Sequence, residues 1–244
     1  MPVALTVAHI DDIPNIVAAE RDSFENPLQP IFRLYCPIFH SREESIASNA
    51  TEYQESIREQ DSNVENVWLK VFDSDTSGKE TIVGGAQWLF VVKETTSIDQ
   101  HVRSLASRYP AGGATIFASQ AFRILREAEA RQKEGRSGEH AYATLGTFFT
   151  IPEYRRRGIG HTLMEWGLKR ADEKGLEAWI EAVPPAVPFY EAYGFVQMET
   201  THLNPKRPVS LSVEATAEWN ATAESLLPIT ATVMCRPART KDAE

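Results

Sequence analysis

The segment from Tyr154 to His161, Tyr-Arg-Arg-Arg-Gly-Ile-Gly-His, is the feature that most constrains the fold of this chain. It follows an apolar, β-rich stretch from Tyr142 to Ile151 and opens an amphipathic stretch that ends near Lys174. This order predicts a buried strand, a sharp turn through two glycines, and the N-terminus of a helix. Such a turn directs several backbone N–H groups at one point, with the helix dipole behind them, and is suited to binding a pyrophosphate.

Three arginines, Arg155, Arg156 and Arg157, lie on this turn, although the chain as a whole has a formal net charge of −9. A cation at a helix N-terminus opposes the helix dipole and costs about 0.3–1 kcal/mol. Their placement favours an anionic ligand over the alternative, a solvated cluster of surface charges. The acidic balance of the whole chain argues against nucleic acid or an anionic membrane as a partner, because both require a basic surface.

Periodic patterns along the chain predict an α/β (α+β) fold. Strands are expected at about 5–10, 64–72, 81–92, 141–150, 177–183, 195–199 and 226–235. Helices are expected at about 13–25, 41–60, 160–174 and 188–193, and residues 202–223 are expected to form a polar linker. In the first helix, the apolar stripe of Ile13, Ile16, Val17 and Phe24 has one polar exception, Glu20.

Residues 93–139 interrupt the alternation of strands and helices, with a helix expected from Phe117 to Lys133. We predict a partly helical insertion, which either shapes a substrate site or is a surface appendage without function. The prediction is one domain over residues 1–236, followed by a disordered, charged tail at 237–244.

The two cysteines, Cys36 and Cys235, have no metal-ligand spacing, so we expect free thiols and no metal. The N-terminus lacks the apolar core of a signal peptide, and no apolar run is long enough to span a bilayer. These features predict a cytoplasmic protein and leave a nuclear location open.

Two familiar phosphate-binding turns do not fit Arg155–Gly160. A dinucleotide-binding turn needs a third glycine, but Leu163 occupies the position three after Gly160. A P-loop needs Gly-Lys followed by Ser or Thr, which this turn lacks. Coenzyme A binding is the third interpretation of this turn, and a Rossmann oxidoreductase stays open as a distant alternative.

Tyr154–Gly160 resembles the Gln/Arg-x-x-Gly-x-Gly/Ala signature of the GNAT superfamily of acyl-CoA N-acyltransferases. Phe189–Phe195 resembles the Tyr-x-x-x-Gly-Phe segment of the same family. The resemblance covers residues from about 5 to 199, and the sequence around Trp166 is most similar to fungal members. It implies a mixed, mostly antiparallel twisted sheet with helices on both faces, in which the central strands at 141–150 and 177–183 splay apart.

The resemblance also implies where acetyl-CoA binds as the co-substrate. The pantetheine arm is expected to run beside strand residues Phe148, Phe149 and Thr150, where a backbone N–H would stabilise the oxyanion. The main chain of the turn is expected to hold the pyrophosphate, and the arginine side chains are candidates for the ribose 3′-phosphate. The residues of this cradle are Arg155, Arg156, Arg157, Gly158, Ile159, Gly160 and His161.

Acetyl transfer to an amine requires a neutral nucleophile, and an alkylamine with a pKa near 10 is only about one part in a thousand unprotonated at pH 7. Glu181 interrupts an apolar strand beside the expected cofactor strand and is the predicted base; the alternative is a charge paired with an arginine. Tyr190 matches the family's tyrosine and is the predicted acid for the leaving thiolate; the alternative is a core aromatic. Pro184-Pro185-Ala186 stands where the family often has Asn or Ser and Gly, which affects the acceptor side.

These features predict an N-acetyltransferase that moves an acetyl group from acetyl-CoA to a primary amine by direct attack in a ternary complex. A small-molecule amine is the expected acceptor, and a monomer or homodimer is expected. A protein lysine or N-terminal amine, and a non-catalytic acyl-CoA sensor, are the alternatives.

Overall fold

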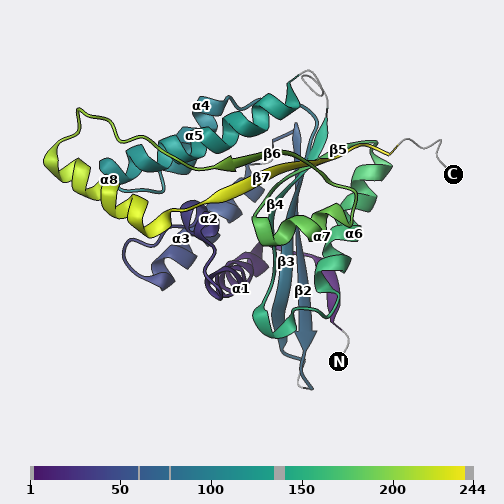
Figure 1. Ribbon diagram of the computed structural model, residues 1–244. Coiled ribbons are helices and arrows are strands. Elements are labelled where there is room, and N and C mark those ends of the chain that lie inside the picture. The colour runs from purple at the N-terminus through teal and green to yellow at the C-terminus, as the bar shows by residue number, and fades with distance from the viewer. Residues whose placement is uncertain (1–2, 60, 77, 135–140, 240–244) are drawn as a thin grey trace.

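Seven strands form one open sheet in the computed structural model, which describes residues 3–59, 61–76, 78–134 and 141–239. The order across the sheet is β1-β2-β3-β4-β5-β7-β6 (Figure 1). The strands are β1 (Ala4–Val7), β2 (Val64–Ser74), β3 (Glu80–Val91), β4 (Tyr142–Thr150), β5 (Glu177–Ala182), β6 (Val196–His202) and β7 (Thr230–Arg236). Neighbouring strands are antiparallel except β4 and β5, so the predicted mixed, mostly antiparallel sheet is confirmed.

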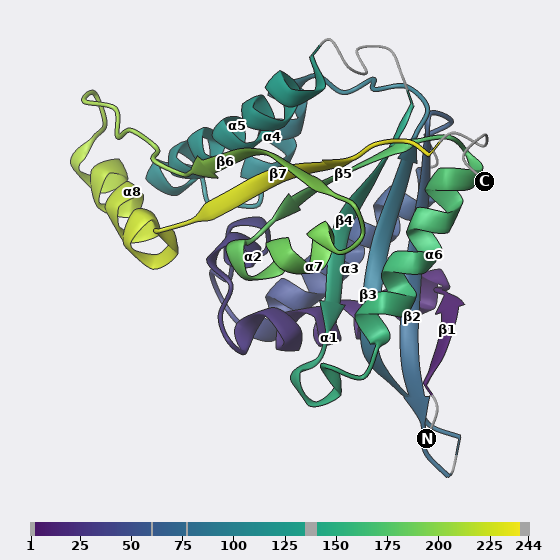
Figure 2. The same ribbon diagram turned by 45° about the vertical axis from the view of Figure 1, so that its right-hand side comes forward.

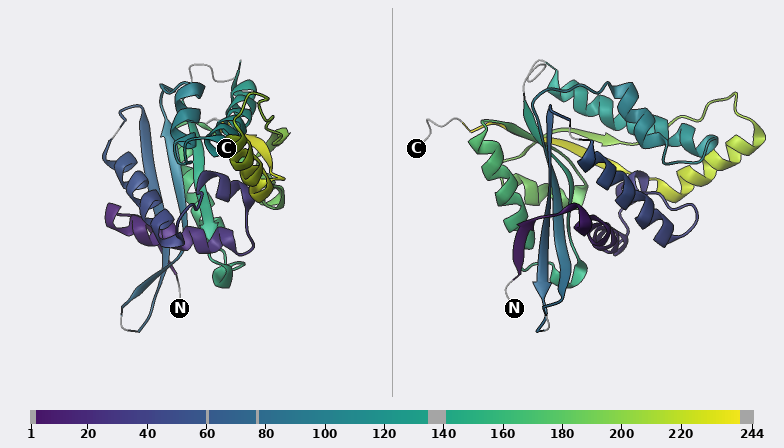
Figure 3. Two further views of the ribbon diagram at one scale, coloured as in Figure 1. Left: turned by 90° about the vertical axis from the view of Figure 1, so that its left-hand side faces the viewer. Right: turned by 180° about the vertical axis from the view of Figure 1, so that it is seen from behind.

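Helices cover both faces of this sheet, as Figures 2 and 3 show. Helices α1, α3, α4 and α5 lie on one face, called here the α1 face, and α6 and α7 lie on the other, called the α6 face. The helices are α1 (Ile13–Glu25), α2 (Pro30–Tyr35), α3 (Arg42–Arg58), α4 (Ile98–Ala106), α5 (Gly113–Lys133), α6 (Ile159–Glu173), α7 (Val187–Glu191) and α8 (Val213–Leu226).

Helix α1 is amphipathic, and its apolar stripe determines how it packs. Ile13, Ile16 and Val17 are buried in a cluster with Trp68 of β2 and Phe149 of β4. Because residues three and four apart lie on one side of a helix, Glu20 points toward the sheet with this stripe and is also buried.

Helix α6 packs closely on the opposite face. Gly167 lies against Trp88 of β3, and a Cβ added at Gly167 would lie 1.9 Å from Trp88 Cε2. Trp88 has no exposed surface, so its ring has no open space to move into. Glycine therefore sets the separation between α6 and the sheet, and hence the position of the turn at the start of α6.

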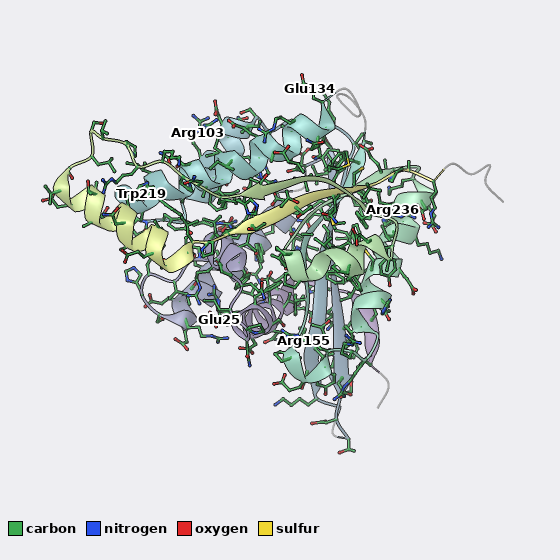
Figure 4. The ribbon with its side chains drawn as sticks, viewed as in Figure 1. Glu25, Arg103, Glu134, Arg155, Trp219 and Arg236 are labelled. Atoms are coloured by element: carbon green, nitrogen blue, oxygen red, sulfur yellow. The ribbon has the colours of Figure 1, made fainter. Side chains whose placement is uncertain are left out.

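The predicted polar linker at 202–223 is wrong in its second half, because α8 begins at Val213. Ser212 caps this helix by accepting a hydrogen bond from the Ala215 N–H at 3.2 Å. The helix has little amphipathic pattern, and it is held by α5, where Trp219 meets Phe117 edge to face (Figure 4). This contact depends on chain segments about a hundred residues apart.

The described part of the stretch at 93–139, residues 93–134, holds helices α4 and α5, and α5 begins at Gly113 rather than at Phe117. A Cβ at Gly113 would lie 1.8 Å from the Ala215 carbonyl oxygen, so the first turn of α5 is in close contact with α8. Residues 135–139 of the predicted insertion and 240–244 of the predicted tail lie outside the described residues.

Replacing Gly167 by alanine is expected to lower the free energy of unfolding by about 1–3 kcal/mol, because the added methyl group overlaps the buried indole of Trp88. Thermal and urea denaturation measure the change. Lys169→Ala, on the exposed side of the same helix, is the control and should stay within about 0.5 kcal/mol of the wild type. Equal stability of Gly167→Ala and the control would contradict this account of the packing.

Candidate active site

The sheet opens between β4 and β5. These strands pair only from Tyr142 with Glu177 to Thr144 with Trp179, and beyond that point no pairing joins them. In Figures 1 and 2, β6 and β7 run across the picture, whereas β2, β3 and β4 run vertically. Gly146 is exposed although β4 lies in the middle of the sheet. One edge of β4 therefore faces a gap rather than a neighbouring strand.

Aromatic side chains line this gap on the α6 face. The ring of Phe148 lies 5.6 Å from that of Phe189 and 6.3 Å from that of Tyr190. Burial raises the pKa of Tyr190, so its hydroxyl remains protonated at neutral pH. Within the part of the chain that the structure describes, this hydroxyl makes no hydrogen bond. It is thus a proton donor without a partner beside the gap.

The turn before α6 adopts an unusual backbone conformation. Arg156 has φ of 63° and Gly158 has φ of 84°, both in the left-handed region. This conformation costs a non-glycine residue of order 1 kcal/mol and is concentrated at binding sites. The N–H groups of Ile159, Gly160 and His161 open α6 and have no acceptor within the helix. The turn therefore presents three N–H donors for which the helix itself supplies no acceptor.

The helix start lies beside the aromatic wall of the gap. A Cβ at Gly160 would lie 3.4 Å from Phe148 Cζ and 3.6 Å from Phe189 Cζ. His161 is exposed, and its Nδ1 contacts the hydroxyl of Tyr193. Tyr193 therefore borders the turn.

The three arginines of the turn differ in what they contact. The Arg155 guanidinium donates to the carbonyl oxygens of Ser23 at 2.8 Å and Asn26 at 3.1 Å, so it ties the turn to the end of α1 (Figure 4). It also donates to the carbonyl oxygen of Thr150 at 3.3 Å. Arg157 lies 4.6 Å from the centre of the Tyr154 ring. Arg156 and Arg157 are exposed and are the arginines whose charges lie open to an anion.

The position of Phe149 differs from that of Phe148. Phe149 is buried on the α1 face with Ile13 and Ile16, so only its main chain is near the gap. Thr150 pairs with Gly84 of β3 at the end of β4. Phe148 and Thr150 are thus the two predicted pantetheine neighbours whose side chains lie on the α6 face, and the Thr150 hydroxyl oxygen lies near Gly84 beside Ile159 of α6.

Glu181 lies on β5 on the other side of the sheet, the α1 face. It forms an ion pair with Arg126 of α5 and accepts a hydrogen bond from the Tyr35 hydroxyl at 2.9 Å. Arg126 also donates to the Tyr35 oxygen at 3.0 Å and to Glu129 at 2.7 Å. Burial raises the pKa of Glu181, and Arg126 opposes this rise. The predicted base is therefore held in a charged network supplied partly by the insertion.

A second carboxylate on the α1 face was not predicted as a site residue. Glu20 of α1 is 2% exposed and accepts a hydrogen bond at 2.5 Å from the hydroxyl of Thr147, which lies on β4 beside the gap. Its other oxygen, Oε2, is buried without a hydrogen-bond partner among the described residues. Burial raises the pKa of Glu20 to about 7. The sequence signal was the polar residue that interrupts an apolar helix face.

The cysteine thiols are buried and reduced. Burial raises the pKa of Cys36 to about 12, so it is a poor nucleophile at neutral pH.

Over the described ranges, no group of three or more His, Cys, Asp or Glu is arranged to hold a metal ion. Nor does any described helix combine the length and the apolar character needed to cross a membrane.

Comparison with known proteins agrees with this geometry. Residues 31–195 match the sequence model of the acetyltransferase (GNAT) family, which covers more than half of the chain. The chain therefore belongs to the GNAT family of acyl-CoA-dependent N-acetyltransferases, and the resemblance inferred from the turn is confirmed. A search of curated proteins found no match.

Solved structures show the same fold at low sequence identity. A mosquito arylalkylamine N-acetyltransferase like 5b is 13% identical, with a TM-score of 0.63 and coverage of 96% of this chain and 99% of that chain. A polyamine N-acetyltransferase from Drosophila melanogaster is 11% identical, with a TM-score of 0.62 and the same coverage. Arylalkylamine N-acetyltransferase 2 from Aedes aegypti is 9% identical, with a TM-score of 0.64 and coverage of 98% and 100%.

Reversing the charge of Arg157 to glutamate is expected to weaken acetyl-CoA binding about ten- to a hundredfold, because an anion would then face the diphosphate. Calorimetry at low salt measures the affinity, and added salt should reduce the difference. Lys169→Glu makes the same charge change more than two turns further along α6 and should have little effect. Unchanged affinity of Arg157→Glu would place the diphosphate elsewhere.

Glu20→Gln is expected to change how stability depends on pH. The Glu20 carboxyl titrates at about 7 in the folded protein, against a usual value of 4.5 in the unfolded chain. Raising the pH from about 4.5 to 7 should therefore destabilise the wild type relative to the variant, by up to about 3 kcal/mol. Urea denaturation at several pH values tests this, with exposed Glu55→Gln as the control. Parallel curves for the wild type and Glu20→Gln would exclude the raised pKa.

Proposed function

We propose that this protein transfers the acetyl group of acetyl-CoA to a small-molecule primary amine by direct attack in a ternary complex. One observation carries the proposal: the gap between β4 and β5 has donors for a diphosphate on one face and buried carboxylates on the other. A thioester in the gap could thus be reached by an amine from the opposite face, and no covalent enzyme intermediate is needed.

The α6 face is the proposed cofactor side. The diphosphate would accept hydrogen bonds from the N–H groups at the start of α6, in the field of the helix dipole. The exposed arginines Arg156 and Arg157 would face the diphosphate and the ribose 3′-phosphate, whereas Arg155 would hold the turn in place through its carbonyl contacts. The pantetheine amides would pair with the free edge of β4, as an added strand does.

Tyr190 is the proposed acid. Its hydroxyl is protonated, lies among the aromatic side chains beside Phe148, and has no hydrogen bond to any other described residue. When the carbon–sulfur bond breaks, the leaving thiolate would take the hydroxyl proton. The amine must lose a proton on the other face, where Glu181 and Glu20 are the two candidate acceptors.

Two observations support a small acceptor. Helix α5 covers part of the α1 face, where its Ala128 packs on Trp179 and its Arg126 pairs with Glu181, which restricts access to the gap. The names of three structurally similar proteins also refer to arylalkylamines, a polyamine and agmatine, all of them small amines. A screen for thiol release from acetyl-CoA with amines, amino acids and peptides tests the proposal. Turnover with peptides alone would refute it, and binding of acetyl-CoA without turnover would indicate a sensor.

Tyr190→Phe is expected to lower turnover about a hundredfold or more while leaving acetyl-CoA affinity within about twofold, because the hydroxyl acts only when the thiolate leaves. Steady-state kinetics and calorimetry measure the two quantities. Tyr109→Phe removes another buried hydroxyl, which donates to the Leu34 carbonyl at 2.8 Å away from the gap, and should leave turnover unchanged. Equal turnover of Tyr190→Phe and the wild type would remove Tyr190 from the acid role.

A further inference from the structure

We propose that Thr147 and Glu20 form a proton relay, in which the Thr147 hydroxyl accepts a hydrogen bond from the acceptor amine and transfers its own proton to Glu20. This inference rests on the proposed acetyl transfer and identifies which carboxylate receives the proton. Thr147 is the catalytic residue of the pair, because it would touch the amine, and Glu20 acts through it.

A bulge places Thr147 at the gap. The register of β3 against β4 shifts between Gln87, which pairs with Thr147, and Trp88, which pairs with Leu145, so Gly146 is the extra residue. A Cβ at Gly146 would lie 2.4 Å from Gln87 Oε1, so a larger residue there would displace the end of the Gln87 side chain. Thr147 consequently faces α1, as Phe149 does, whereas Phe148 faces the aromatic side chains of α7.

The Thr147 hydroxyl connects a buried group with an open one. Its oxygen lies 2.5 Å from Glu20 Oε1, and Glu20 is buried. Thr147 itself is half-buried, and its neighbour Gly146 is exposed in the part of β4 that has no partner in β5. A hydroxyl can donate one hydrogen bond and accept others, so Thr147 can accept from an amine while it donates to Glu20.

The charged groups near Glu20 make their contacts elsewhere. Arg21 donates to the Ser45 hydroxyl at 2.8 Å and to the Cys36 carbonyl at 3.4 Å. Arg108 donates to the Tyr35 carbonyl at 2.8 Å and forms an ion pair with Glu52. The Cys36 thiol and the Tyr53 hydroxyl also face Glu20, and burial raises the pKa of both groups, so both are neutral. Protonation of Glu20 therefore breaks no ion pair with any residue that the structure describes.

Glu20 suits this role better than Glu181, because the two carboxylates differ in their contacts with cations. A proton on Glu181 would cancel its attraction to Arg126, which lies in direct contact. Among the described residues Glu20 forms no ion pair, and its pKa of about 7 is close to the value at which a base is most effective near neutral pH. Glu181, already engaged by Arg126, is not needed as the base in this scheme.

The acceptor nitrogen loses two protons in the proposed reaction. The acceptor enters as an ammonium; one of its protons passes to the Thr147 oxygen as the Thr147 proton passes to Glu20. The freed nitrogen lone pair forms a bond to the thioester carbonyl carbon, and the carbon–sulfur bond then breaks with its electron pair on sulfur. The thiolate takes the Tyr190 proton, and the second proton of the nitrogen restores the Tyr190 hydroxyl. The products are the amide, coenzyme A and protonated Glu20, which releases its proton to water.

The test is the pH dependence of kcat at saturating acetyl-CoA, with phenethylamine and agmatine as the amines, because kcat reports ionisation within the ternary complex. For the wild type, kcat should rise tenfold per pH unit below about 7 and then level off. Glu20→Gln and Thr147→Val should lower the plateau about a hundredfold and abolish this rise. Thr147→Ser, which keeps the hydroxyl, should retain the rise, and so should Glu181→Gln.

A purely structural role for the Glu20–Thr147 hydrogen bond predicts a different result. In that case Glu20→Gln and Thr147→Val would lower stability, while the rise of kcat with pH would persist. That outcome would overturn the relay, and loss of the rise in Glu181→Gln alone would assign the proton to Glu181. If Glu20→Gln does not fold, as judged by circular dichroism, the contrast between Thr147→Val and Thr147→Ser decides.

Failure of the relay can be told apart from failure of the proposed function. A wild type that binds acetyl-CoA but releases no thiol with any amine refutes both. A wild type that turns over, with variants whose pH profiles match it, refutes the relay alone.

Discussion

The separation of β4 from β5 beyond Thr144 and Trp179 is the constraint on which the site depends. Backbone N–H and C=O groups inside a sheet normally pair with a neighbouring strand, and leaving them unpaired costs free energy. Here the free edge of β4 is compensated by exposure, since Gly146 is open to solvent in a central strand. The same edge can bind an extended ligand, and the opening joins the two faces of the sheet.

The two faces carry opposite kinds of chemistry. On the α6 face, peptide donors and exposed arginines meet an aromatic wall that ends in the protonated hydroxyl of Tyr190. On the α1 face, Glu181 contacts Arg126, whereas no cation among the described residues forms an ion pair with Glu20. A buried carboxylate without a paired charge tends to keep its proton, which is why two glutamates so close to one gap can serve different roles.

Local sequence patterns predicted the elements that form the site. The glycine turn, the strand before it and the helix after it follow from residues adjacent in the chain, as does the β2–β3 hairpin. Helix α8 was missed because its amphipathic pattern is weak and its packing surface belongs to α5. The register bulge at Gly146 was also missed, since it becomes visible only when β3 and β4 are paired.

The sequence by itself determined the chemistry of the turn: glycines, arginines and a helix start lie within eight residues of one another, so their geometry is local. Only the tertiary structure decided what the charged side chains contact. Arg155 binds carbonyls at the end of α1, Glu181 pairs with Arg126 of α5, and Glu20 binds Thr147 from a position 127 residues earlier. Burial and partners of a charge depend on segments that meet only when the chain folds, and these set its pKa.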